Sequence, residues 1–182
     1  MTKILSINEH ENNYQPTIIK LKSRAIINNS EGKILIANYG GVYLYPGGSI
    51  EERETPEKAV IREIKEEIGI EFEVLKPLVK MRHFQFNYPT RENTTTDRLV
   101  ITYYYAGQAN QIQMENANQT QEEKKDNFQV GFYSIDEIKH LIRKNNTQNP
   151  RNRYFNEELD TILEYYRQNY KVITKEYDEK IK

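Results

Sequence analysis

Three glutamates, Glu63, Glu66 and Glu67, are spaced so that their carboxylates can act together. On an α-helix each residue turns the chain by about 100°, so Glu66 and Glu67 lie within about 60° of Glu63 on one face. Like charges at these spacings destabilise a helix by roughly 0.2–0.5 kcal/mol per pair. A hard divalent cation, which prefers oxygen ligands, would neutralise them. The spacing therefore indicates a metal site.

Arg62 directly precedes this cluster and lies four residues before Glu66. Its planar guanidinium can form two parallel hydrogen bonds to a carboxylate, so it can neutralise part of the cluster and orient one member. For an ordinary surface helix, a solvated acidic face is the better explanation in about four cases of five. Here the glycines on both sides, Gly47-Gly48 and Gly69, fix the ends of the stretch and favour a site.

The stretch GSIEERETPEKAVIREIKEEIGI follows a longer pattern. It reads Gly, five residues, Glu, seven residues, then Arg-Glu-apolar-any-Glu-Glu-any-Gly-apolar, and it resembles the box motif of the Nudix hydrolase family at every defined position. A chance match in a chain of this length is on the order of one in ten million at ordinary residue frequencies. The residues at the defined positions are Gly48, Glu54, Arg62, Glu63, Ile64, Glu66, Glu67, Gly69 and Ile70.

The resemblance implies an α+β fold in which a mixed, curved sheet lies between helices. It implies a hydrolase that cleaves a diphosphate link with Mg²⁺ or Mn²⁺ and needs no covalent nucleophile. The metal ligands it implies are Glu63, Glu66 and Glu67 with the carbonyl of Gly47. Arg62 would position a carboxylate and Glu54 would pair across the loop and helix. The resemblance leaves the general base open.

One more metal-binding carboxylate is expected from a later loop, because many relatives supply one there. Asp126 is our prediction, and Glu122 and Glu123 are alternatives. For substrate contacts we consider Gly48 in the box and three residues outside it, Tyr43, Tyr88 and Arg91. Tyr43 could equally pack in the core or at its rim, and a tyrosine at position 88 could equally arise by chance. Arg91 is more often a solvated loop charge, at about two to one.

The elements around the box are predicted from hydrophobic periodicity. Strands are expected at Thr17–Leu21, Arg24–Asn28, Lys33–Ala37 and Val42–Tyr45, with a turn at Asn29–Gly32 and a loop of unusual backbone angles at Pro46–Gly48. The box helix is expected at Pro56–Ile68, because Thr55 can cap its first turn, Pro56 suits its first position and Gly69 suits a left-handed end.

Beyond the box, strands are expected at Glu71–Val79, Arg82–Asn87, Leu99–Tyr105 and Phe128–Tyr133, with a polar loop at Tyr88–Asn93. The tyrosines at 103–105 should pack on both faces of the sheet, and His83 is expected to be a partly exposed strand histidine. The segment Ala109–Asp126 has little periodicity and is expected to be a mobile loop. Ser134–Glu137 is a capping box that opens a helix to about Arg143, and a last helix is expected from Asn156 to about Tyr170.

Composition sets limits on function. The 182 residues fit one domain with a core at about 17–145 and a helical extension at about 150–182. The net charge of −1 gives no global attraction to nucleic acid or to a membrane, and the absence of cysteine excludes thiolate chemistry. We expect a cytoplasmic protein that acts on a small nucleotide. Its last helix could also pack against a partner, which would give a homodimer.

The substrate expected first is a nucleoside diphosphate linked to another moiety, including a nucleoside triphosphate. A dinucleoside polyphosphate or an ADP-ribose-type compound is the alternative within the same family. The alternative from another class is a Nudix module that senses a nucleotide without cutting it. The complete set of carboxylates favours catalysis over sensing.

Overall fold

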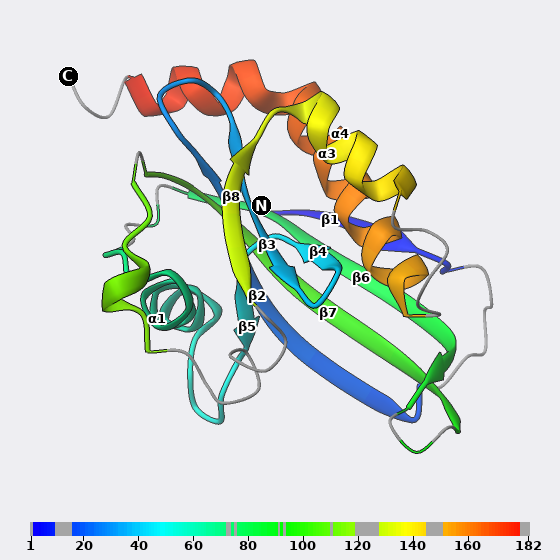
Figure 1. Cartoon of the computed structure of the whole chain (residues 1–182). Coiled ribbons are helices and arrows are strands. Elements are labelled where there is room, and N and C mark those ends of the chain that lie inside the picture. Colours follow the sequence, from blue (N-terminus) through cyan, green and yellow to red (C-terminus); the bar gives the residue numbers. More distant parts are fainter. Residues whose placement is uncertain are drawn as a thin grey trace.

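The computed structural model describes residues 2–9, 16–71, 74, 76–90, 92, 94–109, 111–118, 128–144 and 151–178. A twisted sheet lies between α1 on one side and α3 with α4 on the other (Figure 1). The strands are β1 (Lys3–Ile7), β2 (Ile18–Asn28), β3 (Ile34–Tyr39), β4 (Val42–Leu44), β5 (Gly47–Ser49), β6 (Lys76–Pro89), β7 (Thr95–Gln108) and β8 (Gln129–Tyr133). The helices are α1 (Pro56–Ile68), the 3₁₀ helix η1 (Met114–Asn116), α3 (Ile135–Lys144) and α4 (Asn152–Asp178).

The sheet is mixed, as expected for an α+β fold. The main path of the described strands runs β1-β6-β7-β2-β3-β4, with β5 paired to β2 and β8 paired to β3. Strands β2 and β7 are parallel, as are β1 and β6, and the other pairs are antiparallel. The predicted strand Leu99–Tyr105 lies inside β7, between β6 and β2, so it is a central strand.

Each face of the sheet packs against its own hydrophobic cluster. Successive residues of a strand point to opposite faces. On β2, Ile26 therefore joins the cluster under α3 and α4, whereas its neighbours Ala25 and Ile27 join the cluster under α1. The tyrosines of β7 divide in the same way, because Tyr104 packs under α4 and Tyr105 under α1. This alternation confirms the prediction that the aromatic run packs on both faces.

The box helix has the predicted bounds, and two predicted breaks in strands are wrong. The predicted strands at 17–21 and 24–28 are one continuous β2. Likewise β6 runs through the predicted gap at 80–81 and through Tyr88 and Pro89, which were expected in a loop. Asn87 adopts a positive φ of 53°, and the pairing with β7 shifts register between Gln85 and Tyr88, so the strand continues through an irregularity.

The segment 109–126 was expected to be a mobile loop without elements, and for residues 111–118 this is wrong. They contain η1 and pack against the end of α1, where the amide of Gln113 donates to Ile68 O at 3.3 Å and that of Asn118 to Glu66 O at 2.8 Å. The last carbonyls of a helix have no partner within the helix, so an adjacent chain can satisfy them. Residues 110 and 119–127 lie outside the described residues.

The two C-terminal helices form as predicted, and α4 is longer than expected. In the capping box before α3, Ser134 N donates to Glu137 Oε2 at 2.7 Å and Glu137 N donates to Ser134 Oγ at 3.3 Å. The predicted stripe on α4 is buried against the sheet of its own chain, so packing within the chain explains its apolar character. The stripe consists of Leu159, Ile162, Leu163 and Tyr166.

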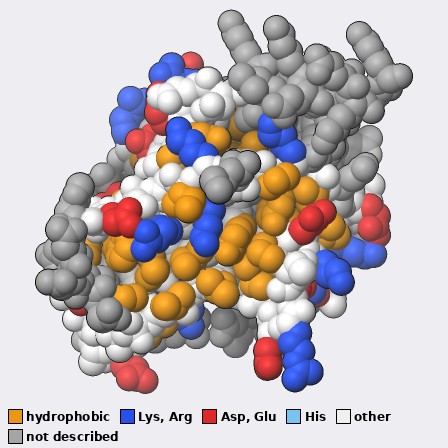
Figure 2. All heavy atoms as spheres, turned by 180° about the vertical axis from the view of Figure 1, so that it is seen from behind, with side chains coloured by type: hydrophobic (Ala, Val, Ile, Leu, Met, Phe, Trp, Pro, Cys, Tyr) orange, Lys and Arg blue, Asp and Glu red, His pale blue; other side chains and the backbone are white. Residues whose placement is uncertain are grey.

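Seen from behind, hydrophobic side chains gather across one side of the molecule (Figure 2). The exposed large hydrophobic side chains of the described part include Ile4 on β1 and Ile19 and Leu21 on β2. Among the described helices, none combines the length and the apolar character that a membrane span requires.

Candidate active site

A glycine turn between β4 and α1 forms one edge of the site. Gly47 has a φ of 125°, and a Cβ built on it would lie 2.3 Å from Ser23 O and 2.8 Å from Arg24 Cα, so no side chain fits there. The buried guanidinium of Arg24 donates to Tyr45 O and, at 3.3 Å, to Gly47 O. The predicted loop is in part a short strand, because Gly47, Gly48 and Ser49 pair with β2.

The next glycine, Gly48, makes room for a carboxylate. A Cβ built there would lie 2.4 Å from the carboxyl carbon and from both oxygens of Glu63. The glycine turn and the first carboxylate of the cluster therefore touch directly, and a methyl group at position 48 would displace that carboxylate.

The sequence fixes both ends of α1. Thr55 Oγ1 accepts from Lys58 N at 3.3 Å, Pro56 occupies the first turn, and Gly69 ends the helix with a φ of 78°. Ala59, Val60, Ile64 and Ile68 are buried against the sheet. Burial of that stripe turns the adjoining face, with its carboxylates, toward the glycine turn.

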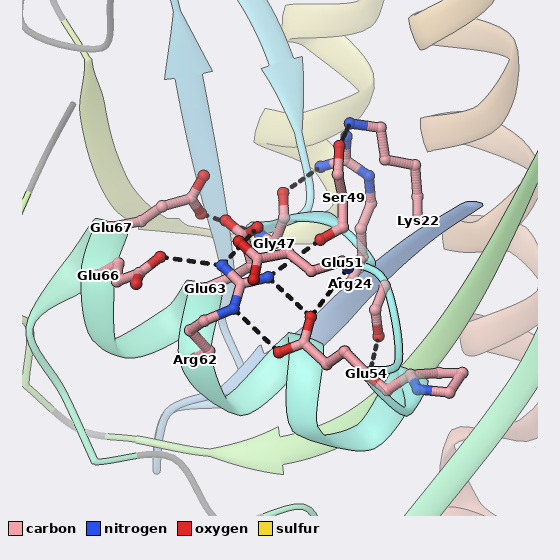
Figure 3. Close-up of polar contacts among 12 residues, drawn as sticks. Lys22, Arg24, Gly47, Ser49, Glu51, Glu54, Arg62, Glu63, Glu66 and Glu67 are labelled. Atoms are coloured by element: carbon pink, nitrogen blue, oxygen red, sulfur yellow. Dashed lines mark hydrogen bonds and ion pairs between the residues drawn. The ribbon is translucent and has the colours of Figure 1, made fainter. Parts of the chain in front are cut away.

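Arg62 is the centre of the polar contacts on this face (Figure 3). Its Nε and Nη2 donate to the two oxygens of Glu54, each at 3.0 Å, and Nη1 donates to Glu63 and Glu66, each at 3.0 Å. Nη2 also donates to Ser49 O at 3.1 Å. These hydrogen bonds, with Glu54 foremost, raise the pKa of Arg62 and lower that of Glu54. One guanidinium thus ties the turn to the helix, as expected of Arg62 and Glu54.

Glu67 is the most buried carboxylate of the cluster, with 3% of its surface exposed. Its Oε1 accepts from the Tyr39 hydroxyl and its Oε2 accepts from Gly47 N at 3.0 Å. Burial raises the pKa of Glu67 to about 7, although both hydrogen bonds oppose the rise. Burial also raises the pKa of Glu63, against the effect of Arg62. Two carboxylates therefore lie where a positive ligand would relieve the cost of their charge.

The turn, α1, β2, β7 and the start of α4 surround a cleft of about 650 Å³. Its acidic wall consists of Glu51, Glu63, Glu66 and Glu67. Its basic wall consists of Lys22, Arg24 and Arg98, and Tyr88 and Phe155 complete the lining on that side. A cleft with two walls of opposite charge suits a ligand that carries both a metal ion and phosphate groups.

The acidic wall offers carboxylate oxygens, which are the ligands that a hard divalent cation prefers. In the described part of the chain, however, no three carboxylate or imidazole groups converge closely enough to hold a metal ion. The reason is visible in the contacts, because Glu63 and Glu66 share Arg62 and Glu67 is held by Tyr39 and Gly47. Metal binding would therefore require Glu66, the most exposed of the three, to turn from Arg62 toward the other two.

The structure brings most of the predicted site residues together. Gly47, Gly48, Arg62, Glu63, Glu66, Glu67 and Tyr88 line the cleft, and Glu54 contacts Arg62 beside it. Tyr43 does not line the cleft, because it is half-buried against the core cluster under α4. Its place is taken by Tyr39 and Leu44. Arg91, Glu122, Glu123 and Asp126 lie outside the described residues.

Two predicted environments are wrong. Tyr88, expected in a polar loop, is 8% exposed within β6, with the guanidinium of Arg98 3.2 Å from its ring centroid. His83, expected to be partly exposed, is fully buried, and its Nε2 lies 3.3 Å from Glu157 Oε2. Both errors have one cause, because α4 covers this part of the sheet and the sequence of a strand does not indicate which distant helix covers it.

The basic wall was missed by our sequence analysis, although a signal for it exists. Lys20, Lys22 and Arg24 alternate along β2, so they point to one face of the sheet. Arg98 joins them because β7 pairs with β2 and places it opposite Ile18. The alternation could be read from the sequence, but the partner strand could not.

Comparison with known proteins shows the family. The model of the NUDIX domain matches residues 21–159, which include the site and the first turns of α4. The chain belongs to the NUDIX domain family. A NUDIX hydrolase from Nitrosomonas europaea has the same fold, with a TM-score of 0.56 and 18% identity over 82% of this chain and 89% of that one.

Two curated relatives match over shorter stretches. An 8-oxo-dGTP diphosphatase of Proteus vulgaris is 39% identical over 69 residues, which are 38% of this chain and 59% of that protein. An RNA pyrophosphohydrolase of Hydrogenovibrio crunogenus is 46% identical over 48 residues, which are 25% of this chain and 29% of that protein. The matched stretches thus span less than two thirds of either relative.

Proposed function

We propose that this protein is a metal-dependent hydrolase that cleaves the diphosphate link of a nucleoside diphosphate joined to another moiety. The observation that carries the proposal is the acidic wall itself. Three carboxylates on one helix face line a cleft, two of them have raised pKa values because they are buried, and a single arginine orients two of them. Isolated carboxylates are costly to bury, so this arrangement is consistent with a functional site.

Mg²⁺ or Mn²⁺ would be held by Glu63, Glu66 and Glu67 with the carbonyl of Gly47. When bound, such an ion neutralises the oxygens of a diphosphate and lowers the pKa of a water molecule. The chain's own residues set the geometry. Arg62 donates to both Glu63 and Glu66 and so holds them beside each other, while the Tyr39 hydroxyl and Gly47 N–H donate to the two oxygens of Glu67.

Arg24 gives the glycine turn its rigidity. It is 7% exposed and donates to the carbonyls of Tyr45 and Gly47, so it holds the backbone of the turn against β2. Charge-assisted hydrogen bonds to a backbone carbonyl are stronger than neutral ones, and here they act away from water. Arg24 is therefore a positioning residue for the proposed Gly47 ligand.

The names of the two curated relatives, a diphosphatase and a pyrophosphohydrolase, support hydrolysis at a phosphate anhydride. The alternative within the family is a dinucleoside polyphosphate or ADP-ribose-type compound as substrate. The alternative from another class is a sensor module that binds a nucleotide without cutting it. Retention of all three carboxylates favours the enzyme over the sensor.

The test is phosphate and pyrophosphate release from nucleoside triphosphates, ADP-ribose, nucleotide sugars and dinucleoside polyphosphates. It is run with Mg²⁺, with Mn²⁺ and with a chelator, on the native chain, on Glu67→Gln and on Glu57→Gln. Glu57 is a matched control, because it is an exposed glutamate of the same helix outside the cleft. Metal-dependent turnover that collapses in Glu67→Gln alone supports the hydrolase. Binding without turnover by the native chain across the panel supports the sensor.

A further inference from the structure

Lys22 and Arg98 of the basic wall are cations, so they cannot be ligands of a metal ion. On the face of the sheet under α4, Lys20, Lys22 and Arg24 of β2 lie beside Arg98 of β7. Lys22, Arg24 and Arg98 line the main cleft, and Lys20 lines the smaller recess that continues from it. Like charges on adjacent strands repel one another. Four cations in this position therefore oppose folding unless negative charge is near.

The protein's own carboxylates offset this charge only in part, because Glu63 acts on Lys22 and Glu158 acts on Arg98, yet burial still lowers the pKa of both cations. Glu158 of α4 is buried in the same recess, and together with Tyr104 it raises the pKa of Arg24 against the effect of burial. Among the residues that the structure describes, no carboxylate lies within ion-pair distance of Lys22 or Arg98, whose polar partners include neutral groups. Lys22 Nζ donates to Ser49 Oγ at 2.8 Å, and Arg98 Nε donates to Gln85 Oε1 at 2.6 Å.

These two cations are also partly removed from water. Burial, followed by repulsion from Arg24, lowers the pKa of Lys22 to about 8, and burial lowers the pKa of Arg98. A freely solvated basic strand would not show this desolvation. Arg98 is further fixed by the ring of Tyr88 under its guanidinium, which leaves it little freedom to turn away.

The position of the basic wall defines what it can bind. It faces the acidic wall across one cleft, so a ligand whose diphosphate is held by a metal ion at the carboxylates would have room to extend over Lys22 and Arg98. Planar guanidinium and ammonium groups bind phosphate oxygens well. A neutral sugar or base would supply no negative charge to either cation.

We propose that Lys22 and Arg98, assisted by Lys20, bind a phosphate that lies outside the scissile diphosphate, so the substrate carries at least three consecutive phosphates. This inference rests on the proposed function and narrows it to nucleoside triphosphates, longer polyphosphates or a triphosphate end. It disfavours ADP-ribose and nucleotide sugars, in which two phosphates join groups without phosphate.

The test measures binding, so that it does not depend on turnover. Two probes of the same nucleoside are used, a triphosphate and a diphosphate whose bridging oxygens are replaced by methylene groups. Their dissociation constants are measured by calorimetry with Mg²⁺ for the native chain, Lys22→Gln, Arg98→Gln and Lys20→Gln. Arg143→Gln is the control, because Arg143 is an exposed arginine of α3 outside both recesses.

The native chain is expected to bind the triphosphate about ten- to a hundredfold more tightly than the diphosphate. Lys22→Gln and Arg98→Gln should each remove most of this preference and leave diphosphate binding nearly unchanged. Lys20→Gln, at an exposed position, should reduce it about two- to fivefold. Arg143→Gln should leave the triphosphate preference unchanged. If thermal unfolding shows that Arg98→Gln is unstable, Arg98→Lys is used in its place, and it should keep part of the preference.

The outcomes separate the two proposals. Equal binding of both probes by the native chain, or equal weakening of both probes in the variants, overturns the triphosphate inference even if some substrate is hydrolysed. A clear triphosphate preference that depends on Lys22 and Arg98, without turnover of any substrate, upholds the inference and overturns the hydrolase.

Discussion

The two glycines of the turn should fail in different ways when each is replaced by alanine. A Cβ at position 47 would meet backbone, at 2.3 Å from Ser23 O and 2.8 Å from Arg24 Cα, and the φ of 125° is unfavourable for any L side chain. Backbone cannot move without disturbing the β2–β5 pairing. The strained conformation alone costs about 1–3 kcal/mol, and the close contact adds to it.

A Cβ at position 48 would instead meet the end of a side chain. It would lie 2.4 Å from the carboxyl atoms of Glu63, where ordinary contacts begin near 3.4 Å, so the carboxylate must move by about 1 Å. A glutamate side chain can do this by rotation, so the free energy of unfolding of Gly48→Ala should fall by less than about 1 kcal/mol. A displacement of this size at a reacting centre costs on the order of a hundredfold in rate.

The assay is urea unfolding of the native chain, Gly47→Ala and Gly48→Ala, together with kcat and KM on the best substrate of the panel. Gly47→Ala should be strongly destabilised, and Gly48→Ala should be folded and nearly inactive. A Gly48→Ala enzyme with native kcat would refute the claimed contact with Glu63. A Gly47→Ala protein of native stability would show that the turn does not need its left-handed residue.

Three further predictions concern charge. Because burial raises the pKa of Glu67 from its ordinary 4.5 to about 7, the folded state keeps this proton at pH values where the unfolded state has lost it. Metal-free stability should therefore fall between about pH 5 and pH 8 and stay flat in Glu67→Gln, as urea unfolding across that range would show. Glu158 behaves oppositely, because burial is outweighed by a hydrogen bond from His83 and by other positive groups, which lower its pKa to about 2. Up to about 3 kcal/mol of stability, present above pH 4.5, should be lost toward pH 2, and Glu158→Gln should abolish this loss in acid unfolding. Arg62→Lys should lower kcat at least about tenfold with a smaller effect on KM, because a lysine cannot hold Glu54 by two parallel bonds and also bridge the cluster; kinetics equal to the native enzyme would contradict this.

The sequence by itself determined the helix that carries the acidic wall. Thr55, Pro56 and Gly69 fix its ends through local backbone chemistry, and the apolar stripe fixes which face is buried. The shared face of the three carboxylates follows from helical spacing alone. Each of these inferences depends on residues within one or two turns of each other, so no distant contact was needed to make them.

The tertiary structure decided the rest of the cleft. Lys22 and Arg98 line one cleft because β2 and β7 are parallel neighbours, although the two residues lie far apart in the sequence. The covering of His83 and Tyr88 depends on where α4 crosses the sheet, which no strand pattern specifies. Local spacing fixes the direction of a side chain relative to its own element, whereas the pairing of strands and the packing of helices fix which side chains face each other across a cleft.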